Sequence, residues 1–214
     1  MSTSRTLEHV AVVHLIEDDR STRAATCRVL KSAGFTVGAY STAAEFLTRL
    51  PDGPGCLVLD LRLPGASGLD LQEQLAMSRN PLPVVFMTGD GDIPNSVRAM
   101  KAGAVDFLIK PVDAPVLLDA VNRALARDAE SRANRAREHQ ARSRYSRLTP
   151  RERDVFAHLI SGQLNKQVGF DLGISERTTK SHRHQILEKM QANSIVDLVR
   201  MAADLRIAPA GKVR

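Results

Sequence analysis

The sequence lacks any long apolar run and has few cysteines, and both absences narrow its possible functions. No stretch of the 214 residues approaches the roughly eighteen apolar residues of a membrane-spanning helix. Arg5 and Glu8 precede the first apolar run, so we expect no secretory signal peptide. Cys27 and Cys56 match no zinc-binding or redox spacing, and apolar residues surround both. We therefore expect a cytoplasmic protein with two buried free thiols and no membrane partner.

Several common catalytic and nucleotide-binding motifs are also missing. The sequence contains neither the phosphate-binding loop of the P-loop proteins nor the GxGxxG pattern of dinucleotide-binding folds. The segment GASG at 65–68 is not the GxSxG nucleophile elbow. The segment GDGD at 89–92 lacks the remaining ligands of a calcium-binding loop. The function therefore has to be sought in residues that the fold brings together.

The charge is distributed unevenly along the chain. Residues 1–126 contain 12 Lys and Arg against 14 Asp and Glu, whereas 127–147 contain 7 against 3 and 148–214 contain 11 against 7. An acidic first part followed by a basic second part indicates two modules, with nucleic acid as a candidate partner of the second.

The first module alternates apolar strands with helical segments. A short apolar run bounded by Gly and Pro ends at Asp60, which is typical of a buried parallel strand. Short connections between such elements require parallel strands and right-handed crossovers. We expect an α/β fold, a flavodoxin-like, doubly wound, five-stranded parallel sheet in the order 2-1-3-4-5. The expected strands are 10–16, 35–40, the strand that ends at Asp60, 83–90 and 104–111, and the expected helices are 20–33, 41–50 (capped by Ser41), 69–78, 93–102 and one from about 113.

Polar residues stand where the predicted strands end. Glu17 and Asp18 follow the first strand, Asp60 ends the third, Thr88 ends the fourth and Lys110 ends the fifth. In this strand order all of them face one crevice at the carboxyl edge of the sheet. Carboxylates gathered there repel one another unless a cation joins them, and oxygen ligands suit Mg²⁺. A carboxylate beside a lysine and a hydroxyl can also act as a nucleophile towards a phosphoryl group.

This module resembles the receiver domains of two-component response regulators, on the motifs EDD (17–19), LDLRLPG (59–65), MTG (87–89), Phe107 and KP (110–111). The resemblance implies that Asp60 is the phosphoacceptor and that Mg²⁺ is held by Asp60, by Asp18 directly, by Glu17 through water and by the backbone carbonyl of Arg62. It further implies that Thr88 and Lys110 contact the phosphoryl oxygens and that Phe107 changes rotamer on activation.

The connector, residues 127–147, is rich in arginine and has no Gly, no Pro and no large aliphatic residue. Helix formers dominate it, so it can extend the fifth helix. Because it has no apolar stripe, we expect a solvated helix or a flexible tether that need not pack on anything. A second hypothesis is that its arginines contact DNA phosphates or a partner chain.

The last module predicts a four-helix, all-α domain. Thr149 and Pro150 begin a helix over 148–162, Gly173 ends a second helix over 164–173, Ser175 caps a third to 190, and a fourth spans 194–205. A helix, a short turn with Gly and a capped helix form a helix-turn-helix pattern. In the third helix one face is apolar and the opposite face is polar, and the polar face is free to meet a DNA major groove. The polar face holds Arg177, Lys180, Ser181 and His184.

This module resembles the LuxR-type DNA-binding domain, on LTPRER, NKQV, LGISERTTKSHR and LEKM. The resemblance makes 175–190 the recognition helix, with Arg177, Thr178, Lys180, Ser181 and His184 as the DNA-binding residues. The sequence departs from the family pattern at Thr179, where a Val usually packs, at Ser181, and at Phe170-Asp171, which we expect to replace a small residue and its neighbour. These departures concern the DNA sequence that is preferred.

The two resemblances together are those of the FixJ/NarL-type response regulators. We expect a receiver over 8–126, an arginine-rich helical linker over 127–146, a DNA-binding domain over 147–206 and a tail over 207–214. The expected function is a transcriptional regulator, not an enzyme, that takes a phosphoryl group from a sensor histidine kinase, uses Mg²⁺ and binds promoter DNA as a dimer. Two alternatives are a metal-dependent phosphotransferase or phosphatase and a constitutive DNA-binding protein whose receiver does not switch.

Overall fold

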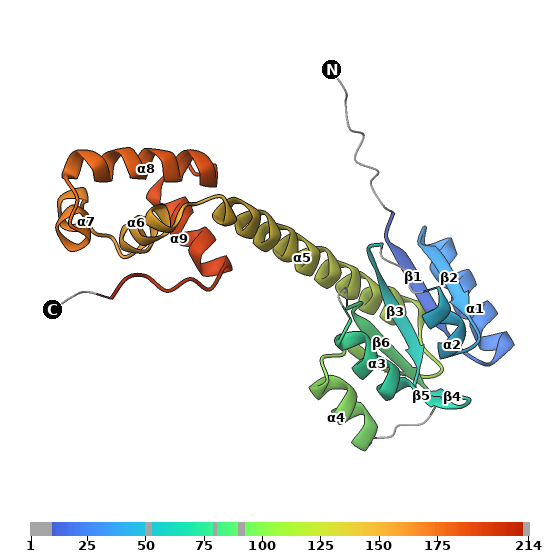
Figure 1. Ribbon diagram of the computed structural model, residues 1–214. Helices are drawn as coiled ribbons and strands as arrows, with labels where there is room; N and C mark the ends of the chain where they lie inside the picture. Colours follow the sequence, from blue (N-terminus) through green and yellow to red (C-terminus); the bar gives the residue numbers. More distant parts are fainter. Residues whose placement is uncertain (1–9, 50–52, 79–80, 90–92, 212–214) are drawn as a thin grey trace. The chain divides into compact units, whose positions relative to one another are not determined.

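The computed structural model describes residues 10–49, 53–78, 81–89 and 93–211, and its contacts divide the chain into two compact units, residues 1–132 and 133–214. The first unit is an α/β domain and the second is helical (Figure 1). Among these described residues, each unit has buried apolar clusters of its own, two in the first and one in the second. The architecture expected from the sequence is therefore present.

Parallel strands form the sheet of the first unit, in the order β2-β1-β3-β6-β7 among the described residues. This is the order 2-1-3-4-5 of the flavodoxin-like fold, which confirms the prediction. In the register, Ile16 pairs with Leu59, Asp60 with Met87, and Thr88 with Ile109, so the strands end almost level with one another. The strands are β1 (Val12–Ile16), β2 (Thr36–Tyr40), β3 (Gly55–Asp60), β6 (Val84–Thr88) and β7 (Asp106–Ile109).

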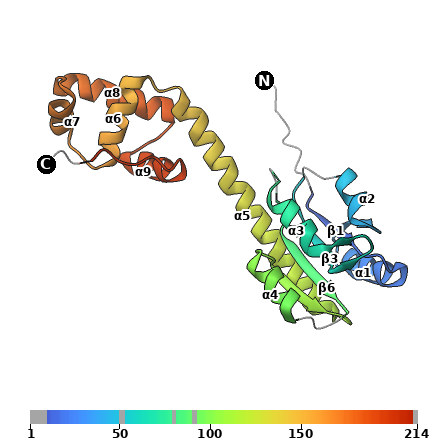
Figure 2. The same ribbon diagram turned by 60° about the horizontal axis from the view of Figure 1, so that its bottom comes forward.

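Helices cover both faces of the sheet because successive residues of each strand point to opposite sides. In β3, Leu57 and Leu59 belong to the buried cluster under α2 (Ala43–Thr48), α3 (Gly68–Ala76) and α4 (Ile93–Lys101). Val58 belongs to the other cluster, under α1 (Arg20–Ser32) and α5 (Ala114–Ser146). Figure 2 shows α3 and α4 next to each other on their side of the sheet. The sheet is thus buried on both faces, as a doubly wound fold requires.

One local prediction was wrong, and one local feature was not predicted. The feature is a small antiparallel hairpin after Asp60, β4 (Arg62–Leu63) with β5 (Ala66–Ser67), and Gly65 takes a positive φ of 77° at its tip. The cap of α2 is Thr42, whose side chain accepts from the N–H of Glu45. Ser41, the predicted cap, instead donates its N–H and its hydroxyl to the carboxylate of Glu45. Ser41 and Thr42 both have a hydroxyl that could cap the helix, and the helix begins after Thr42.

The connector is a helix and not a flexible tether, because α5 continues without a break to Ser146. It does, however, pack at its start. Asp128 is buried, and its Oδ2 accepts from the Gly55 N–H at 2.9 Å and from Arg132 Nε at 2.7 Å. Arg132 also donates to the carbonyl of Gly53. The expectation that the connector need not pack on anything is therefore wrong here, because a polar pair, not an apolar stripe, attaches it to the amino end of β3.

The second unit packs short helices around one apolar cluster that includes Phe156, Ile186 and Met190. Thr149 caps α6, Ser175 caps α8 and Gly173 ends α7, as predicted. Thr149 also forms a capping box with Glu152, and Gly173 takes a positive φ of 66°. The helices after α5 are α6 (Pro150–Ile160), α7 (Asn165–Leu172), α8 (Glu176–Met190) and α9 (Ile195–Asp204). Across the described ranges, no helix combines the length and the apolar character needed to cross a membrane.

Candidate functional site

The carboxyl edge of the sheet brings the predicted polar residues together around Lys110. Its Nζ lies 2.5 Å from Glu17 Oε2 and 2.5 Å from Asp60 Oδ2. Glu17 follows β1, Asp60 ends β3 and Lys110 follows β7, so three separate strands supply the cluster. The parallel register explains why Glu17 and Asp60 lie close together. Ile16 pairs with Leu59, so the next residues along the two strands, Glu17 and Asp60, lie level with each other.

The three acids of this edge form a group that suits a hard cation. One carboxylate oxygen from each of Glu17, Asp18 and Asp60 lies within 4.8 Å of the others. Glu17 and Asp60 are buried, whereas Asp18 is exposed, so the group is open to solvent on one side. A partly open set of carboxylate oxygens fits Mg²⁺, which keeps several of its waters. Arg62 begins β4 and donates its N–H to Asp60 Oδ1 at 3.0 Å, and its carbonyl as a ligand stays a prediction.

Burial and charge oppose each other at this cluster. Burial raises the pKa of Glu17 above its ordinary value, and the hydrogen bond and charge of Lys110 lower it only in part. Burial acts to lower the pKa of Lys110, but its hydrogen bonds to Asp60 and Glu17 outweigh that effect and raise the pKa. Lys110 therefore remains a cation at neutral pH and offers a fixed positive charge.

Thr88 and Phe107 occupy the neighbouring strands. Thr88 ends β6 and is fully buried, and its carbonyl accepts from the Lys110 N–H at 2.7 Å. Phe107 lies in β7, is half-buried, and has its ring centroid 6.2 Å from that of Phe86 in the cluster under α2, α3 and α4. The pairing of β6 with β7 thus connects Thr88 with Lys110 and Phe107 through the backbone.

Two residues that support the edge were not predicted. A Cβ at Gly68 would lie 2.7 Å from the Asp60 carbonyl oxygen, so a residue without a side chain is needed where α3 begins. Arg23 of α1 donates to the carbonyls of Glu17 and Asp18. The sequence offered only weak signals for either residue, a Gly in a Gly-rich turn and an Arg in the helix after the first strand.

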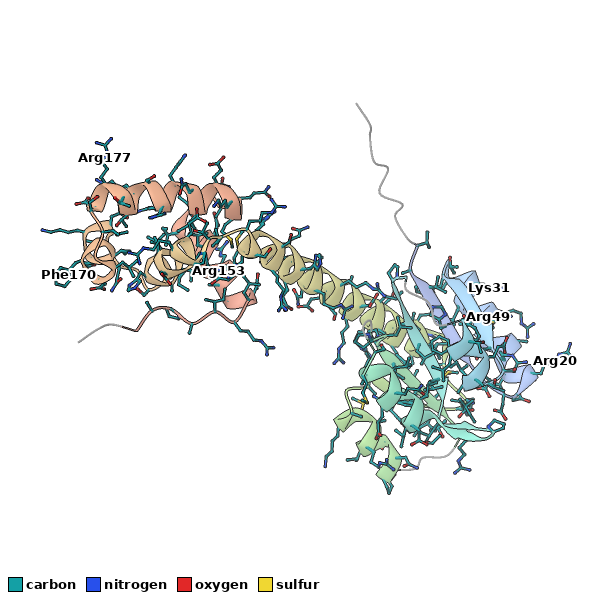
Figure 3. All side chains as sticks on the ribbon, viewed as in Figure 1. Arg20, Lys31, Arg49, Arg153, Phe170 and Arg177 are labelled. Atoms are coloured by element: carbon teal, nitrogen blue, oxygen red, sulfur yellow. The ribbon has the colours of Figure 1, made fainter. Side chains whose placement is uncertain are left out.

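The second unit presents the predicted DNA-binding residues on the exposed side of α8. Arg177, Thr178, Lys180, Ser181 and His184 are all exposed, whereas Thr179, Ile186 and Met190 are buried. Figure 3 shows Arg177 pointing out from the helix. Thr178 shares a hydrogen bond with the capping hydroxyl of Ser175, and Lys180 forms an ion pair with Glu176. Lys189 binds both carboxylate oxygens of the buried Glu152 at 2.7 Å and so fixes α8 against α6.

One departure from the expected pattern has a structural explanation. Thr179 is buried, as expected for a position where a Val usually packs, and its hydroxyl donates to the Ser175 carbonyl at 3.2 Å, so its polar atom is satisfied. The expectation that Phe170 takes the place of a small residue stays a prediction. The small residue at the close approach is Gly169, where a Cβ would lie 2.8 Å from the Ile174 carbonyl oxygen. Phe170 is 87% exposed and points outwards (Figure 3).

Comparison with known proteins decides the family. The family model "Response regulator receiver domain" matches residues 13–122, which is half of the chain, and the model "Bacterial regulatory proteins, luxR family" matches residues 146–202. This chain is a response regulator. It joins a receiver domain to a LuxR-type DNA-binding domain and belongs to the phosphorylation-dependent transcription regulators of two-component systems.

Named relatives of this response regulator match almost their whole length. It is 45% identical over 199 residues to Nodulation protein W of Bradyrhizobium diazoefficiens, covering 92% of this chain and 88% of the relative. It is 41% identical over 199 residues to Transcriptional regulatory protein FixJ of Azorhizobium caulinodans, covering 92% and 94%. Among solved structures, response regulator StyR is 44% identical with a TM-score of 0.79 over 91% of this chain and 98% of that chain. Full-length FixJ from B. japonicum is 37% identical with a TM-score of 0.57 over 92% and 98%.

Proposed function

We propose that Asp60 accepts a phosphoryl group from the phosphohistidine of a sensor histidine kinase and that this modification controls the binding of promoter DNA by α8. The observation that carries the proposal is the position of Lys110, which bridges the buried carboxylates of Glu17 and Asp60 at 2.5 Å each. A carboxylate held beside a fixed cation at the open edge of a sheet is suited to receive a phosphoryl group.

The proposed transfer uses groups that are already in place. One oxygen of the Asp60 carboxylate attacks phosphorus in line, the new O–P bond forms, and the P–N bond to the kinase histidine breaks. The imidazole keeps the electron pair and takes up a proton. Glu17, Asp18, Asp60 and the carbonyl of Arg62 would hold Mg²⁺, which when bound offsets the negative charge of the phosphoryl oxygens. The Lys110 ammonium and the Thr88 hydroxyl would then hold those oxygens.

We further propose that phosphorylation promotes a homodimer through the face of α4, β7 and α5. Large apolar residues of this face are exposed, and Ile109 at 57% is the most exposed of them. Ile109 pairs with Thr88 and lies two residues after Phe107, so the strand that reaches the phosphoryl site also reaches this face. A switch at Thr88 and Phe107 can therefore change the surface that a second copy meets. The face is made by Val97, Met100, Ile109 and Val116.

The proposed domain boundaries follow the sequence: a receiver to 126, a linker over 127–146, a DNA-binding domain over 147–206 and a tail from 207. The compact units divide after Arg132, six residues later than the proposed receiver boundary. Because the partner is promoter DNA, the proposal also places the protein in the cytoplasm.

The first test compares promoter affinity for the wild type and Asp60→Ala, with and without acetyl phosphate and Mg²⁺. We expect the phosphoryl donor to tighten binding at least several-fold in the wild type and not in Asp60→Ala. Asp70→Ala, at an exposed residue of α3, is the control and should respond like the wild type. A donor response that persists without Asp60, or an equal affinity in every case, would contradict the proposal.

The DNA contacts and the dimer each have a separate test. Lys180→Ala should weaken promoter binding and reduce the slope of log affinity against log salt by about 1, since one phosphate contact is lost. Ile109→Glu should keep the donor-treated protein monomeric in sedimentation experiments, whereas Thr36→Glu, at an exposed residue of β2 on the opposite edge of the sheet, should still dimerise. Donor-induced dimers of Ile109→Glu would exclude this face.

A further inference from the structure

Arg23 contacts the backbone that carries two of the acidic residues. It lies in the second turn of α1, and its Nη1 lies 2.5 Å from the carbonyl oxygen of Glu17 and 2.9 Å from that of Asp18. The side chain is half-buried, so its charge is partly withdrawn from solvent. Two hydrogen bonds from one guanidinium to consecutive carbonyls hold a short segment of backbone in one conformation.

This backbone segment lies just beyond the paired part of β1. The strand ends at Ile16, and the Glu17 N–H donates to the Tyr40 carbonyl at 3.2 Å. Asp19 then caps α1 by accepting from the Thr22 N–H at 2.7 Å. The sheet therefore holds the segment before Glu17 and the helix cap holds it after Asp18. Arg23 supplies the contacts in between, at the two residues whose carboxylates belong to the acidic group.

We propose that Arg23 is a positioning residue for the divalent cation of the phosphorylation site. It fixes the peptide groups of Glu17 and Asp18, so that both carboxylates stay directed towards Asp60. Arg23 does not touch the reacting atoms and acts only through these two acids. The inference rests on the proposed function, because it assumes that Mg²⁺ binds at this acidic group.

The positive charge of Arg23 and its hydrogen bonds have opposite effects on the binding of Mg²⁺. A cation near a metal site opposes the binding of another cation, whereas the hydrogen bonds favour it by ordering the ligands. Arg23 also acts on Glu45 of α2, where its charge contributes to the lowered pKa of that carboxyl after the larger effect of the hydrogen bonds from Ser41. Substitutions that separate charge from hydrogen bonding can therefore distinguish the two effects.

The test measures the affinity for Mg²⁺ by calorimetric titration of the full chain. We expect Arg23→Ala to bind Mg²⁺ about ten-fold more weakly than the wild type, which is the size of effect typical for a residue that orients metal ligands. Arg23→Gln keeps a donor without the charge, and Arg23→Lys keeps the charge without the planar fork, so both should lose less. The control is Arg28→Ala, at an exposed residue of the same helix, which should bind like the wild type.

Two further measurements separate positioning from general stability. Without Mg²⁺, the backbone amides of residues 17–19 should exchange hydrogen faster in Arg23→Ala, while the unfolding midpoint of the receiver changes little. With acetyl phosphate, the Mg²⁺ concentration for half-maximal phosphorylation should rise, while the rate at saturating Mg²⁺ stays close to that of the wild type. A lowered rate at saturating Mg²⁺ with unchanged affinity would overturn the inference, because it would place Arg23 in the chemical step.

The outcomes distinguish this inference from the proposed function. If the wild type binds Mg²⁺ and folded Arg23→Ala binds it equally well, the positioning role is excluded and the phosphorylation site stands. If the wild type itself binds no Mg²⁺, the proposed metal site is excluded, and the inference with it. If Arg23→Ala does not fold, Arg23→Lys decides the question. It keeps the charge and loses the planar fork, so Mg²⁺ binding as tight as that of the wild type would exclude the positioning role.

Discussion

Lys110 compensates two buried carboxylates that would otherwise repel each other. Its Nζ reaches Glu17 and Asp60 from the end of β7, and its hydrogen bonds to both raise its pKa. Removing one partner of a buried charge group is costly because the remaining charges keep their desolvation penalty. A cation from solution can take over this role when the lysine is absent.

The first prediction follows for Lys110→Met. Without Mg²⁺, the free energy of unfolding of the receiver should fall by about 2–3 kcal/mol, because two carboxylates remain buried without their cation. Millimolar Mg²⁺ should recover a large part of this loss. Urea unfolding with and without Mg²⁺ measures the effect, and Lys101→Met, at an exposed residue of α4, is the control. A loss that is identical at every Mg²⁺ concentration would show that the carboxylates are not its cause.

His14 is a buried titratable residue apart from the site. It lies in β1, its Nδ1 is 3.2 Å from the Tyr40 hydroxyl, and its ring packs against Phe46. Among the described residues, its Nε2 has no hydrogen-bond partner. Burial lowers the pKa of His14 from 6.5 to about 4. The folded receiver therefore holds this imidazole neutral at a pH where the unfolded chain protonates it.

The second prediction concerns pH. Because the pKa of His14 is lower in the folded state, the unfolded state binds more protons between pH 6.5 and 4, and stability falls as the pH falls. Between pH 7 and 5 the contribution of His14 is a loss of about 2 kcal/mol. This loss of stability should vanish in His14→Leu and remain in His139→Leu. Urea unfolding followed by Tyr40 fluorescence in a Tyr145→Phe background measures it, and an equal pH slope with and without His14 would contradict it.

At the scale of elements, Asp128 and Arg132 attach α5 to the receiver beyond the part of the helix that packs through apolar side chains. Asp128 satisfies the N–H of Gly55 at the start of β3, and Arg132 reaches the carbonyl of Gly53. Where a helix leaves the apolar face of a sheet it loses the stabilisation from apolar packing, and its own hydrogen bonds alone stabilise it only marginally. These contacts keep the helix attached to the amino end of the sheet for one more turn.

The third prediction is for Asp128→Ala. It leaves the Gly55 N–H and the Arg132 guanidinium without their buried acceptor, so the free energy of unfolding of the receiver should fall by about 2–4 kcal/mol. Glu130→Ala, at an exposed residue of the same helical turn, should change it by less than about 0.5 kcal/mol. Urea unfolding of the receiver compares the two, and equal effects would mean that the contacts of Asp128 contribute nothing measurable.

The elements also show what the sequence could predict. Strand order and the meeting of Glu17, Asp60 and Lys110 were predictable, because apolar runs mark the strands and parallel strands end at one edge. The Asp128 contact to Gly55 was not, since no local pattern relates positions 73 residues apart. Nor was the choice of Thr42 over Ser41, because both hydroxyls can cap a helix and only the backbone entering α2 decides. Arg23 was missed because its partners are backbone carbonyls, which leave no mark on the side-chain pattern.

At the scale of the whole molecule, each buried apolar cluster of the described residues is made by residues of one compact unit. The two clusters of the receiver use residues up to Ala124 and Leu125, and the cluster of the second unit starts with Tyr145. The charge is divided in the same way, with the acidic group in the first unit and the exposed cations of α8 in the second. Each unit therefore has its own core and its own candidate binding site.

The fourth prediction concerns thermal unfolding. Because a ligand stabilises only the unit that binds it, calorimetry should resolve two transitions that respond to different additions. At 100 times its dissociation constant, Mg²⁺ should stabilise the receiver by about 3 kcal/mol and leave the second transition in place. A short promoter duplex should shift only the second. A single transition that moves with both ligands would show that the units unfold as one.

The contacts of Asp128 and Arg132 also determine where this protein can be recombined with others. A chimera joined at residue 126 would keep every residue of the phosphorylation site. It would, however, replace Asp128 and Arg132, which contact the amino end of β3. A junction after residue 132 transfers the receiver with these contacts intact. Exchange of output domains within the family should therefore succeed more often when the junction in α5 follows residue 132 than when it follows residue 122, where the matched receiver sequence ends.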